Sequence, residues 1–455
     1  MWFIKTLAQV GLATGLLLVV SLGITEQQGD VPAGMGARAN VDRPKPTFML
    51  HERDKRVHGL RPFQELVDRA EPGSVLKPAP GNYAGPVFID KPLTIEGNGQ
   101  VTIDAGDKGT VMMLDASHIT LRGLHLTGSG ESHDTDDSCL DVRGDHNVIE
   151  NVRADNCLFG IDLKQVNHSV IRNSSVRSKP FELGVRGDGL RLWYSHDNLI
   201  EGNEIIESRD MVAWYSHRNT FRNNLGRKSR YSIHFMFAND NVVEGNRFYD
   251  NAVGVYFMYS EGGVARNNVI SHATGATGMA IGFKEASGIT IENNEFVYCG
   301  IGIGSDLSPF QPDTTIEIRN NRFAFNGIAF QFTSEMGGNV VKDNIFEGNL
   351  TQVAYGSRSN TNDGARNLWE GNYWDDYQGF DRDGDGFGDS RHQLYAYADQ
   401  IWMELPVARF FRSSPVMELL DFLERLAPFS SPDLILEDEK PRFVKPVRKD
   451  SLMKE

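Results

Sequence analysis

The sequence of 455 residues is poor in cysteine, with only Cys139, Cys157 and Cys299. An odd number of cysteines cannot close a complete disulfide framework, so the chain must depend on a packed core. A single bond between Cys139 and Cys157 is one alternative. We favour the other, in which all three are buried thiols.

Basic residues are outnumbered. The chain has 46 Lys and Arg against 61 Asp and Glu, which gives a net charge of −15. A nucleic-acid-binding protein needs a basic surface that replaces the counterions of the phosphates. The sequence has no basic stripe of this kind, and we therefore exclude nucleic acid as a partner.

Long apolar runs are absent except at the start of the chain. Residues 1–23 place one Lys before a run of apolar residues, a pattern typical of an export signal. No cysteine follows the run, which argues against a lipoprotein anchor. An uncleaved anchor helix is the alternative, because the run approaches the ~20 residues that span a bilayer. We assign 1–25 to a signal peptide and 26–54 to a linker rich in Gly, Pro and Ala.

Helical apolar stripes are also scarce, and turn residues take their place. The chain has 46 Gly and a series of asparagines in similar turns. These asparagines are Asn173, Asn203, Asn224, Asn246, Asn268, Asn294, Asn321, Asn344 and Asn372. Several successive spacings are 21 to 23 residues, and a period of this length predicts a solenoid. The segments between them alternate apolar and polar residues, as strands do. We predict an all-β protein, a right-handed parallel β-helix over residues 55–375 with three short strands and three turns per coil.

The two ends of the repeat differ from its middle. Residues 61–99 begin with a short amphipathic helix, which we expect to cap the solenoid and stop edge-to-edge growth. The period fails after Asn372. We assign 376–412 to an acidic loop and end cap, and 413–455 to a C-terminal helix and a partner-docking tail. The tail after residue 436 has mixed charge, and we expect it to be disordered or ordered only in a complex.

One short phrase occurs twice at the repeat interval. HFMF at 234–237 returns as YFMY at 256–259, an offset of 22 residues. Stacked coils would place Met236 and Met258 on the outer face at the strand spacing of about 4.8 Å. We expect Gly282 to follow them in the same column.

Soft donor atoms gather around this phrase. Thioether sulfur selects Cu(I) over hard ions, and imidazole also suits copper. We predict a Cu(I) site formed by Met236 and Met258 with His234 and with His196 or His217. Because the metal needs neutral imidazole, we expect binding to weaken as the pH falls through the His range near ~6.5.

In the coils before the two methionines, aromatic residues occupy the same outward column and the position that follows it. Trp193 and Trp214 share the outward column, and Tyr194 and Tyr215 follow them. A contiguous apolar patch on a surface marks an interaction site. We predict an interaction stripe at these four residues. The alternative is that a segment of the chain itself, such as the C-terminal tail, covers the stripe.

These motifs resemble the NosD family, the periplasmic maturation proteins of nitrous oxide reductase. The resemblance is carried by the phrase in 231–260 and by the ending EGNYWDDYQGFDRDGDGFGD at 370–389, and it extends over about residues 55 to 430. It implies a non-enzymatic periplasmic protein that acts with an ABC transporter, composed of the ATPase NosF and the membrane subunit NosY. It also implies that copper comes from the lipoprotein NosL and goes to nitrous oxide reductase, NosZ. The copper residues given above rest on the column pattern alone.

The acidic loop predicts a second metal. Asp381, Asp383 and Asp385 alternate with glycines, followed by Phe387 and Asp389. Carboxylates at positions 1, 3 and 5 and a backbone carbonyl at position 7 suit Ca²⁺. We predict a calcium site in which Asp389 replaces the usual Glu of position 12. The alternative is a solvated acidic turn.

Two other functions compete with copper handling. The same scaffold serves carbohydrate lyases and epimerases. In that interpretation the loop residues His133, Asp134, Asp136 and Asp137 would do acid–base work on a sugar. Asp141, Asp162, Lys164 and Arg191 would line the sugar groove. The third interpretation is a docking platform without metal.

Overall fold

The computed structural model describes residues 59–275, 277–334, 337–355, 367–396 and 433–447, with isolated residues between 414 and 423. The predicted signal peptide and linker lie outside these residues. Within the described residues, no helix is both long enough and apolar enough to cross a membrane.

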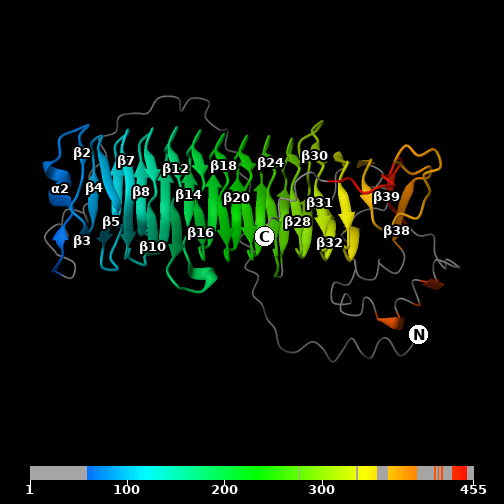
Figure 1. Ribbon diagram of the computed structural model, residues 1–455, viewed down its shortest axis with the longest axis horizontal. Helices are drawn as coiled ribbons and strands as arrows, with labels where there is room; N and C mark the ends of the chain where they lie inside the picture. The colour runs from blue at the N-terminus through cyan, green and yellow to red at the C-terminus, as the bar shows by residue number, and fades with distance from the viewer. Residues whose placement is uncertain are drawn as a thin grey trace, which may run out of the picture. The chain divides into compact units, whose positions relative to one another are not determined.

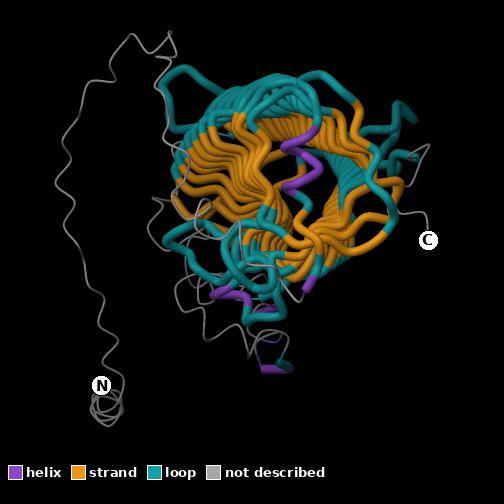
Figure 2. The backbone as a smooth tube through the Cα atoms, turned by 90° about the vertical axis from the view of Figure 1, so that its left-hand side faces the viewer, coloured by secondary structure: helices purple, strands orange, loops and turns teal. Residues whose placement is uncertain are grey.

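The described chain is a right-handed parallel β-helix, which confirms the predicted fold (Figure 1). Each coil contributes one strand to each of three parallel faces. Seen along the axis, the strands form a wall around the interior (Figure 2), which the buried side chains of the core fill. Coils stack because each strand hydrogen-bonds to the strand one repeat before and one repeat after it.

Face 1 is a sheet of 12 strands. Its strands are β4 (Val87–Ile89), β6 (Met112–Asp115), β8 (Ser138–Arg143), β11 (Phe159–Lys164), β14 (Leu190–Trp193), β17 (Asp210–Trp214), β20 (Tyr231–Met236), β23 (Val253–Met258), β26 (Met279–Lys284), β29 (Ile301–Asp306), β32 (Ile328–Ser334) and β35 (Thr351–Tyr355). This face carries the residues of the candidate site.

Face 2 follows face 1 in each coil. Its strands are β2 (Val75–Leu76), the first part of β5 (Thr94–Asp104) and of β7 (Thr120–Thr127), β9 (Val148–Glu150), β12 (Val170–Arg172), β15 (Leu199–Glu201), β18 (Thr220–Arg222), β21 (Val242–Glu244), β24 (Val264–Arg266), β27 (Thr290–Glu292), β30 (Ile316–Arg319), β33 (Asn339–Lys342), β36 (Leu368–Glu370) and β39 (Asp433–Asp438).

Face 3 closes the coil. Its strands are β1 (Arg61–Pro62), β3 (Gly81–Ala84), the second part of β5 and of β7, β10 (Arg153–Cys157), β13 (Ser175–Ser178), β16 (Glu204–Ile206), β19 (Leu225–Arg227), β22 (Arg247–Tyr249), β25 (Val269–Ser271), β28 (Glu295–Val297), β31 (Arg322–Ala324), β34 (Ile345–Glu347) and β37 (Tyr373–Trp374).

Buried asparagines join the coils at the turn between faces 2 and 3. The side-chain oxygen of Asn246 accepts the backbone N–H of Asn224 at 2.8 Å, and its amide nitrogen donates to the carbonyl of Phe221 at 2.9 Å. The same pattern repeats from Asn203 to Asn372. Each Asn thus satisfies two buried backbone groups of the preceding coil, which defines the register of the stack.

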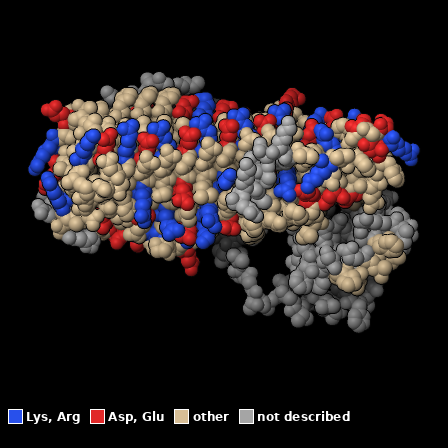
Figure 3. All heavy atoms as spheres, in the orientation of Figure 1, with Lys and Arg blue, Asp and Glu red and all other residues tan. Residues whose placement is uncertain are grey.

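An alternating row of charges runs along the outside of face 2. Paired strands place opposite charges side by side, as in Arg222 beside Glu201 at 2.8 Å and Arg266 beside Glu244 at 3.2 Å. The row contains Glu96, Arg122, Glu150, Arg172, Glu201, Arg222, Glu244, Arg266, Glu292 and Arg319. Figure 3 shows basic and acidic groups alternating along the solenoid. Like charges would repel at this spacing, so the alternation also opposes a slip of one coil.

Both ends of the solenoid are covered. At the N-terminal end, α2 (Gln64–Arg69) buries Val67 beside the adjacent Phe63, and the Gln64 side chain hydrogen-bonds both backbone groups of Phe88. The predicted helical cap is therefore present. Within the predicted C-terminal helix, the described residues 415, 416, 419, 422 and 423 are helical.

The C-terminal tail is part of the other cap. β39 pairs in parallel with β36 and antiparallel with β38 (His392–Ala396). Asp438, fully buried, accepts the backbone N–H and the side-chain amide of Asn372, both at 3.0 Å. It ends the asparagine ladder with an acceptor. Arg442 reaches Asp343 at 2.6 Å. The prediction of disorder after residue 436 is wrong for 437–447. The contacts of Asp438 and Arg442 with the end of the solenoid stabilise this segment, and composition alone does not reveal them.

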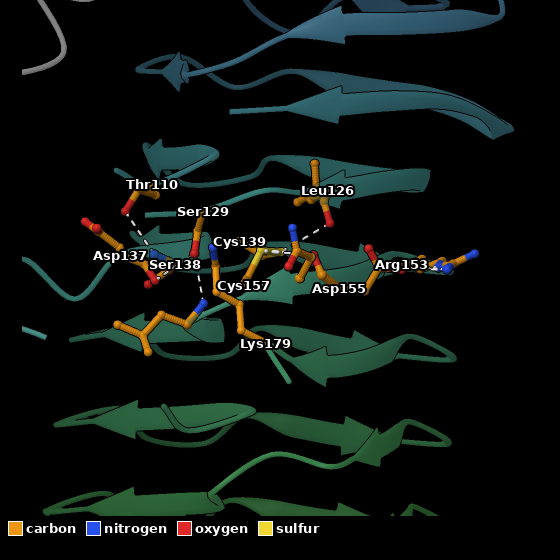
Figure 4. The surroundings of a disulfide bond; sticks show 12 residues. Thr110, Leu126, Ser129, Asp137, Ser138, Cys139, Arg153, Asp155, Cys157 and Lys179 are labelled. Carbon is orange, nitrogen blue, oxygen red and sulfur yellow. Dashed lines mark hydrogen bonds and ion pairs between the residues drawn. A yellow bond between two sulfur atoms is a disulfide. The ribbon is translucent and has the colours of Figure 1, made fainter. Parts of the chain in front are cut away.

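A disulfide bond joins Cys139 and Cys157 inside the solenoid (Figure 4). Both residues are fully buried, one at the start of β8 and the other at the end of β10. The preference for free thiols at these two positions is therefore wrong; 18 residues apart in sequence, they meet because one coil returns on itself. Cys299 is a buried thiol as expected, and burial raises its pKa to about 12.

We predict that Asn246→Ala lowers the free energy of unfolding by about 2–4 kcal/mol, since it leaves several buried backbone groups unsatisfied. The control is Asn223→Gly at an exposed position with φ of 56°. That change should alter stability by less than about 0.5 kcal/mol. Urea unfolding of both variants measures the difference, and equal losses would contradict the role of the ladder.

Candidate functional site

The outer surface of β20 and β23 brings the predicted soft donors together. Met236 pairs with Met258, and His234 pairs with Tyr256. Phe235 alternates with His234 and Met236 and is fully buried in the core. The pleat therefore turns His234 and both methionines to the same outer face.

His234 is the unusual member of this group. Its side chain is on the outer face, yet the residue is only 9% exposed. Both ring nitrogens are buried and have no hydrogen-bond partner among the described residues. An unsatisfied buried polar group costs about 1–3 kcal/mol, so these two nitrogens are the donor atoms on this face that could hold a ligand.

Aromatic rings enclose the imidazole. The ring of Tyr231 stacks on His234 with centroids 4.9 Å apart, and the ring of Tyr256 lies edge-on at 6.1 Å. Burial lowers the pKa of His234, against the opposing effect of Asp210. The imidazole is therefore neutral at neutral pH, which is the form that binds a metal.

An ion pair covers this enclosure. The guanidinium of Arg230 lies 5.0 Å from the ring centroid of Tyr231, within cation–π range. Arg230 is paired with the buried carboxylate of Asp210, with Nε and Oδ1 3.0 Å apart. The pair neutralises charge close to His234 and fixes Tyr231 above it.

The strand register shows that the predicted neighbour of Met258 in the next coil, Gly282, is wrong. Met258 pairs with Lys284, and Gly282 pairs instead with Tyr256. The expected column was shifted by two residues because the insertion in this coil falls in the turn before β26. A cation therefore follows Met258, and its amine lies 6.0 Å from the ring centroid of Tyr259.

Gly282 has a different role from the one expected. A Cβ atom at this position would overlap the ring of Tyr256 and would lie 2.7 Å from the sulfur of Met279. The absence of a side chain therefore lets Tyr256 and a third thioether pack on the outer face. Met279 stands at the start of β26, outside the column of Met236 and Met258.

His196 and His217 have a structural role. Their rings stack with centroids 5.1 Å apart. The Nδ1 atom of His196 accepts the backbone N–H of His217 at 3.0 Å, and Nδ1 of His217 accepts that of Asn239 at 2.9 Å. In the neutral ring the proton then lies on Nε2, which leaves no free lone pair for a metal. The structure thus groups His234 with the methionines and separates these two histidines from them.

The four predicted stripe residues form one aromatic cluster. Trp193 and Trp214 meet edge-on at 5.3 Å, and Tyr194 stacks on Tyr215 at 4.9 Å. The stack continues through Phe237, 5.1 Å from Tyr215. Tyr194 is 45% exposed. The cluster reaches Met236 through Trp214, which pairs with it across β17 and β20.

The acidic loop assembles three of its predicted ligands. One carboxylate oxygen from each of Asp381, Asp383 and Asp385 lies within 4.8 Å of the others. Asp381 also accepts the backbone N–H groups of Gly384 and Gly386, at 2.7 and 3.0 Å.

Asp389 is set apart from the other predicted carboxylates, whereas Phe387, predicted to bind through its backbone carbonyl, is held by its ring. Asp389 accepts the backbone N–H of Arg382 at 2.8 Å and lies outside the three-carboxylate group. The ring of Phe387 lies under the amine of Lys440 at 4.3 Å and the guanidinium of Arg442 at 4.9 Å. The C-terminal tail therefore holds the loop against the end of the solenoid.

The proposed sugar-groove residues form a neutralised network. The fully buried Asp162 lies 2.6 Å from Arg191 and 3.0 Å from Lys164. Lys164 also pairs with Asp141 at 3.1 Å, and Arg191 with Asp136 at 2.8 Å. Carboxylates held between cations are poor general bases, which does not favour acid–base catalysis here.

The sequence analysis missed a second group of histidines. His118, His146 and His168 occupy one corner position in three successive coils, and all three are exposed. Their ring centroids are 5.1 and 5.2 Å apart in sequence order. The segments DASHIT, RGDHNVI and VNHSVI contain the signal, since each places a His two residues before a strand.

Residues 166–379 match the family model described as "Periplasmic copper-binding protein (NosD)". The chain carries a NosD domain. This domain contains His234, Met236 and Met258. A relative from Pseudomonas aeruginosa, named "Probable ABC transporter binding protein NosD", is 28% identical over 403 residues, with 81% of this chain and 88% of the relative covered. A relative of the same name from Stutzerimonas stutzeri is 25% identical, with 81% and 86% covered.

Solved structures show the same fold. The A-module of a mannuronan C-5 epimerase from Azotobacter vinelandii superposes with a TM-score of 0.52 at 16% identity, covering 64% of this chain and 90% of that module. This likeness shows the β-helix and carries no information about the chemistry of the NosD domain.

We predict that His217→Asn preserves stability at pH 7.5, whereas His217→Ala lowers it by about 1 kcal/mol. Asn239 occupies the next position of the same ladder and accepts the backbone N–H of Glu261 at 3.0 Å, so Asn can replace the imidazole acceptor. Equal losses in both variants, measured by denaturant unfolding, would contradict the ladder role.

The pH dependence of stability should report the same histidines. Burial lowers the pKa of His196, His217 and His234. The unfolded chain therefore takes up protons below pH ~6.5 that the folded chain does not, and stability falls as the pH drops below that value. His217→Asn should make this fall shallower, because it removes one of the groups; an unchanged slope would contradict the assignment.

Proposed function

We propose that this chain binds Cu(I) as cargo in the periplasm and takes part in the maturation of nitrous oxide reductase with an ABC transporter. The observation that carries the proposal is His234, a buried neutral imidazole whose two nitrogens lack partners beside two thioethers. The family description, periplasmic and copper-binding, supports the same function.

The donor set fits Cu(I) better than a hard ion. One imidazole nitrogen and the two sulfurs of Met236 and Met258 are soft or borderline donors. The carboxylate of Asp210 close to His234 is paired with Arg230, and it is therefore not a free ligand for Ca²⁺ or Mg²⁺. Burial keeps His234 neutral, so proton competition should begin only below its ordinary pKa near ~6.5.

Delivery requires that an acceptor can displace the ligands. His234 is buried, but Met236 and Met258 are half-exposed at the end of their strands. An incoming donor can therefore replace the thioethers first, before the imidazole releases the ion. The aromatic cluster beside Met236 supplies a docking surface for that donor or acceptor.

The partners follow from this role. We infer that the copper-donor lipoprotein NosL loads the site, that NosF and NosY form the transporter, and that NosZ, the reductase, receives the metal. The names of the two relatives support an ABC transporter as a partner. The role requires no catalytic step by this chain.

We predict that Met236→Leu/Met258→Leu weakens Cu(I) binding by about 100-fold, or about 2.8 kcal/mol. Leu keeps the apolar volume and removes both sulfurs, so the fold should be unchanged. Competition with a colorimetric Cu(I) chelator measures the affinity of the full chain.

The control is Met279→Leu, which removes a thioether outside the methionine pair. It should leave Cu(I) affinity within a few fold of the wild type. If Cu(I) affinity and maturation of nitrous oxide reductase both survive the double change, the site lies elsewhere and the patch serves only for docking.

We also propose that the acidic loop binds Ca²⁺ as a structural clamp between the solenoid and the tail. Asp383→Ala should lower the melting temperature only when Ca²⁺ is present, because ligand binding to the native state supplies the stability. Asp381 is not a suitable test, since its carboxylate also holds two backbone N–H groups. Equal melting shifts with Ca²⁺ and with a chelator would contradict the site.

A further inference from the structure

His118, His146 and His168 form an exposed ladder at the corner between faces 1 and 2. Each follows a face 1 strand, namely β6, β8 and β11. Each has a left-handed backbone, with φ of 61°, 60° and 54°. The backbone N–H of His118 donates to Asp145, and that of His146 donates to Asn167, so the main chain fixes adjacent coils side by side.

The backbone does not require histidine at these positions. The same column continues with Asp197, Arg218, Asp240 and Gly262, all with positive φ. Gly, Asn and Asp adopt this conformation at little cost. Three successive histidines therefore need an explanation in their side chains.

The rings also have no structural task of the kind found in the neighbouring column. The Nδ1 atoms of His196 and His217 are occupied by backbone N–H groups. In contrast, among the described residues the three exposed rings contact one another and hold no backbone group. Their nitrogens remain available to a ligand from solvent.

We propose that His118, His146 and His168 form a second copper site, which captures Cu(I) at the surface. Imidazole nitrogen is a suitable copper ligand. With metal–nitrogen bonds of about 2.0–2.1 Å, one ion can bridge two rings whose centroids are about 5 Å apart after small side-chain rotations. His146 belongs to both pairs of neighbouring rings. An ion can therefore move from the His118–His146 pair to the His146–His168 pair by exchanging one ligand at a time.

The position of the ladder connects it with the proposed function, on which this inference rests. The histidines follow the C-terminal ends of face 1 strands, and Met236 and Met258 stand at the same ends of β20 and β23. Both sites thus lie along one edge of the solenoid. The ladder would hold copper at the early coils, and the buried site would hold it at the later ones.

The test uses the full chain and Cu(I) in a chelator buffer. His146→Asn removes the ring shared by both pairs while retaining a residue that tolerates the left-handed backbone. We expect the wild type to bind one more Cu(I) ion than His146→Asn, with the melting temperature unchanged. The control His217→Asn, in the locked pair, should bind as many ions as the wild type.

The Met236→Leu/Met258→Leu variant separates this inference from the proposed function. If it loses one ion and His146→Asn loses another, both sites stand. If it binds as many ions as the wild type while His146→Asn still loses one, the buried site fails and the ladder stands. Wild-type stoichiometry in His146→Asn would overturn the ladder, as would an equal loss in His217→Asn, which would indicate unspecific binding to surface imidazole.

Discussion

The hydrogen bonds of the asparagine ladder are the constraint on which the rest of the structure depends. A strand exposes alternate residues, so a slip of one residue would turn Met236 into the core and Phe235 to the surface. Each buried Asn satisfies two backbone groups of the preceding coil, and a slip would leave them unpaired. The candidate site can persist only because this cost is large compared with the weak preferences of the outer side chains.

Three groups of histidines among the described residues differ in the hydrogen bonds of their rings. His196 and His217 accept backbone N–H groups as the asparagines do. His234 is buried without a partner, and the histidines represented by His146 are exposed in a stacked row. Only a ring with a free nitrogen can bind copper. Sequence spacing groups His196 and His217 with His234, although the hydrogen bonds of the first two rings leave no nitrogen for the metal.

Particular residues show where prediction succeeded and failed. The pairing of Met236 with Met258 followed from the repeat, because both coils have the same length. The position of Lys284 did not, because an insertion can fall in any of three turns and moves only the residues after it. The alternating charges of Arg222 and Glu244 were visible in sequence once the period was known, but they gain meaning only from the pairing of their strands.

The sequence by itself determined the β-helix, its asparagine turns and the outward methionines, because a short period and an alternating pattern are local properties that each coil repeats. Only the tertiary structure decided that Cys139 meets Cys157, that Asp438 ends the ladder and that His234 is enclosed by Tyr231 and Tyr256. These contacts depend on how far a loop extends and which way a ring turns. Neither follows from residue spacing, because both are set by packing between segments that are distant along the chain or by rotamers that the neighbouring coils select.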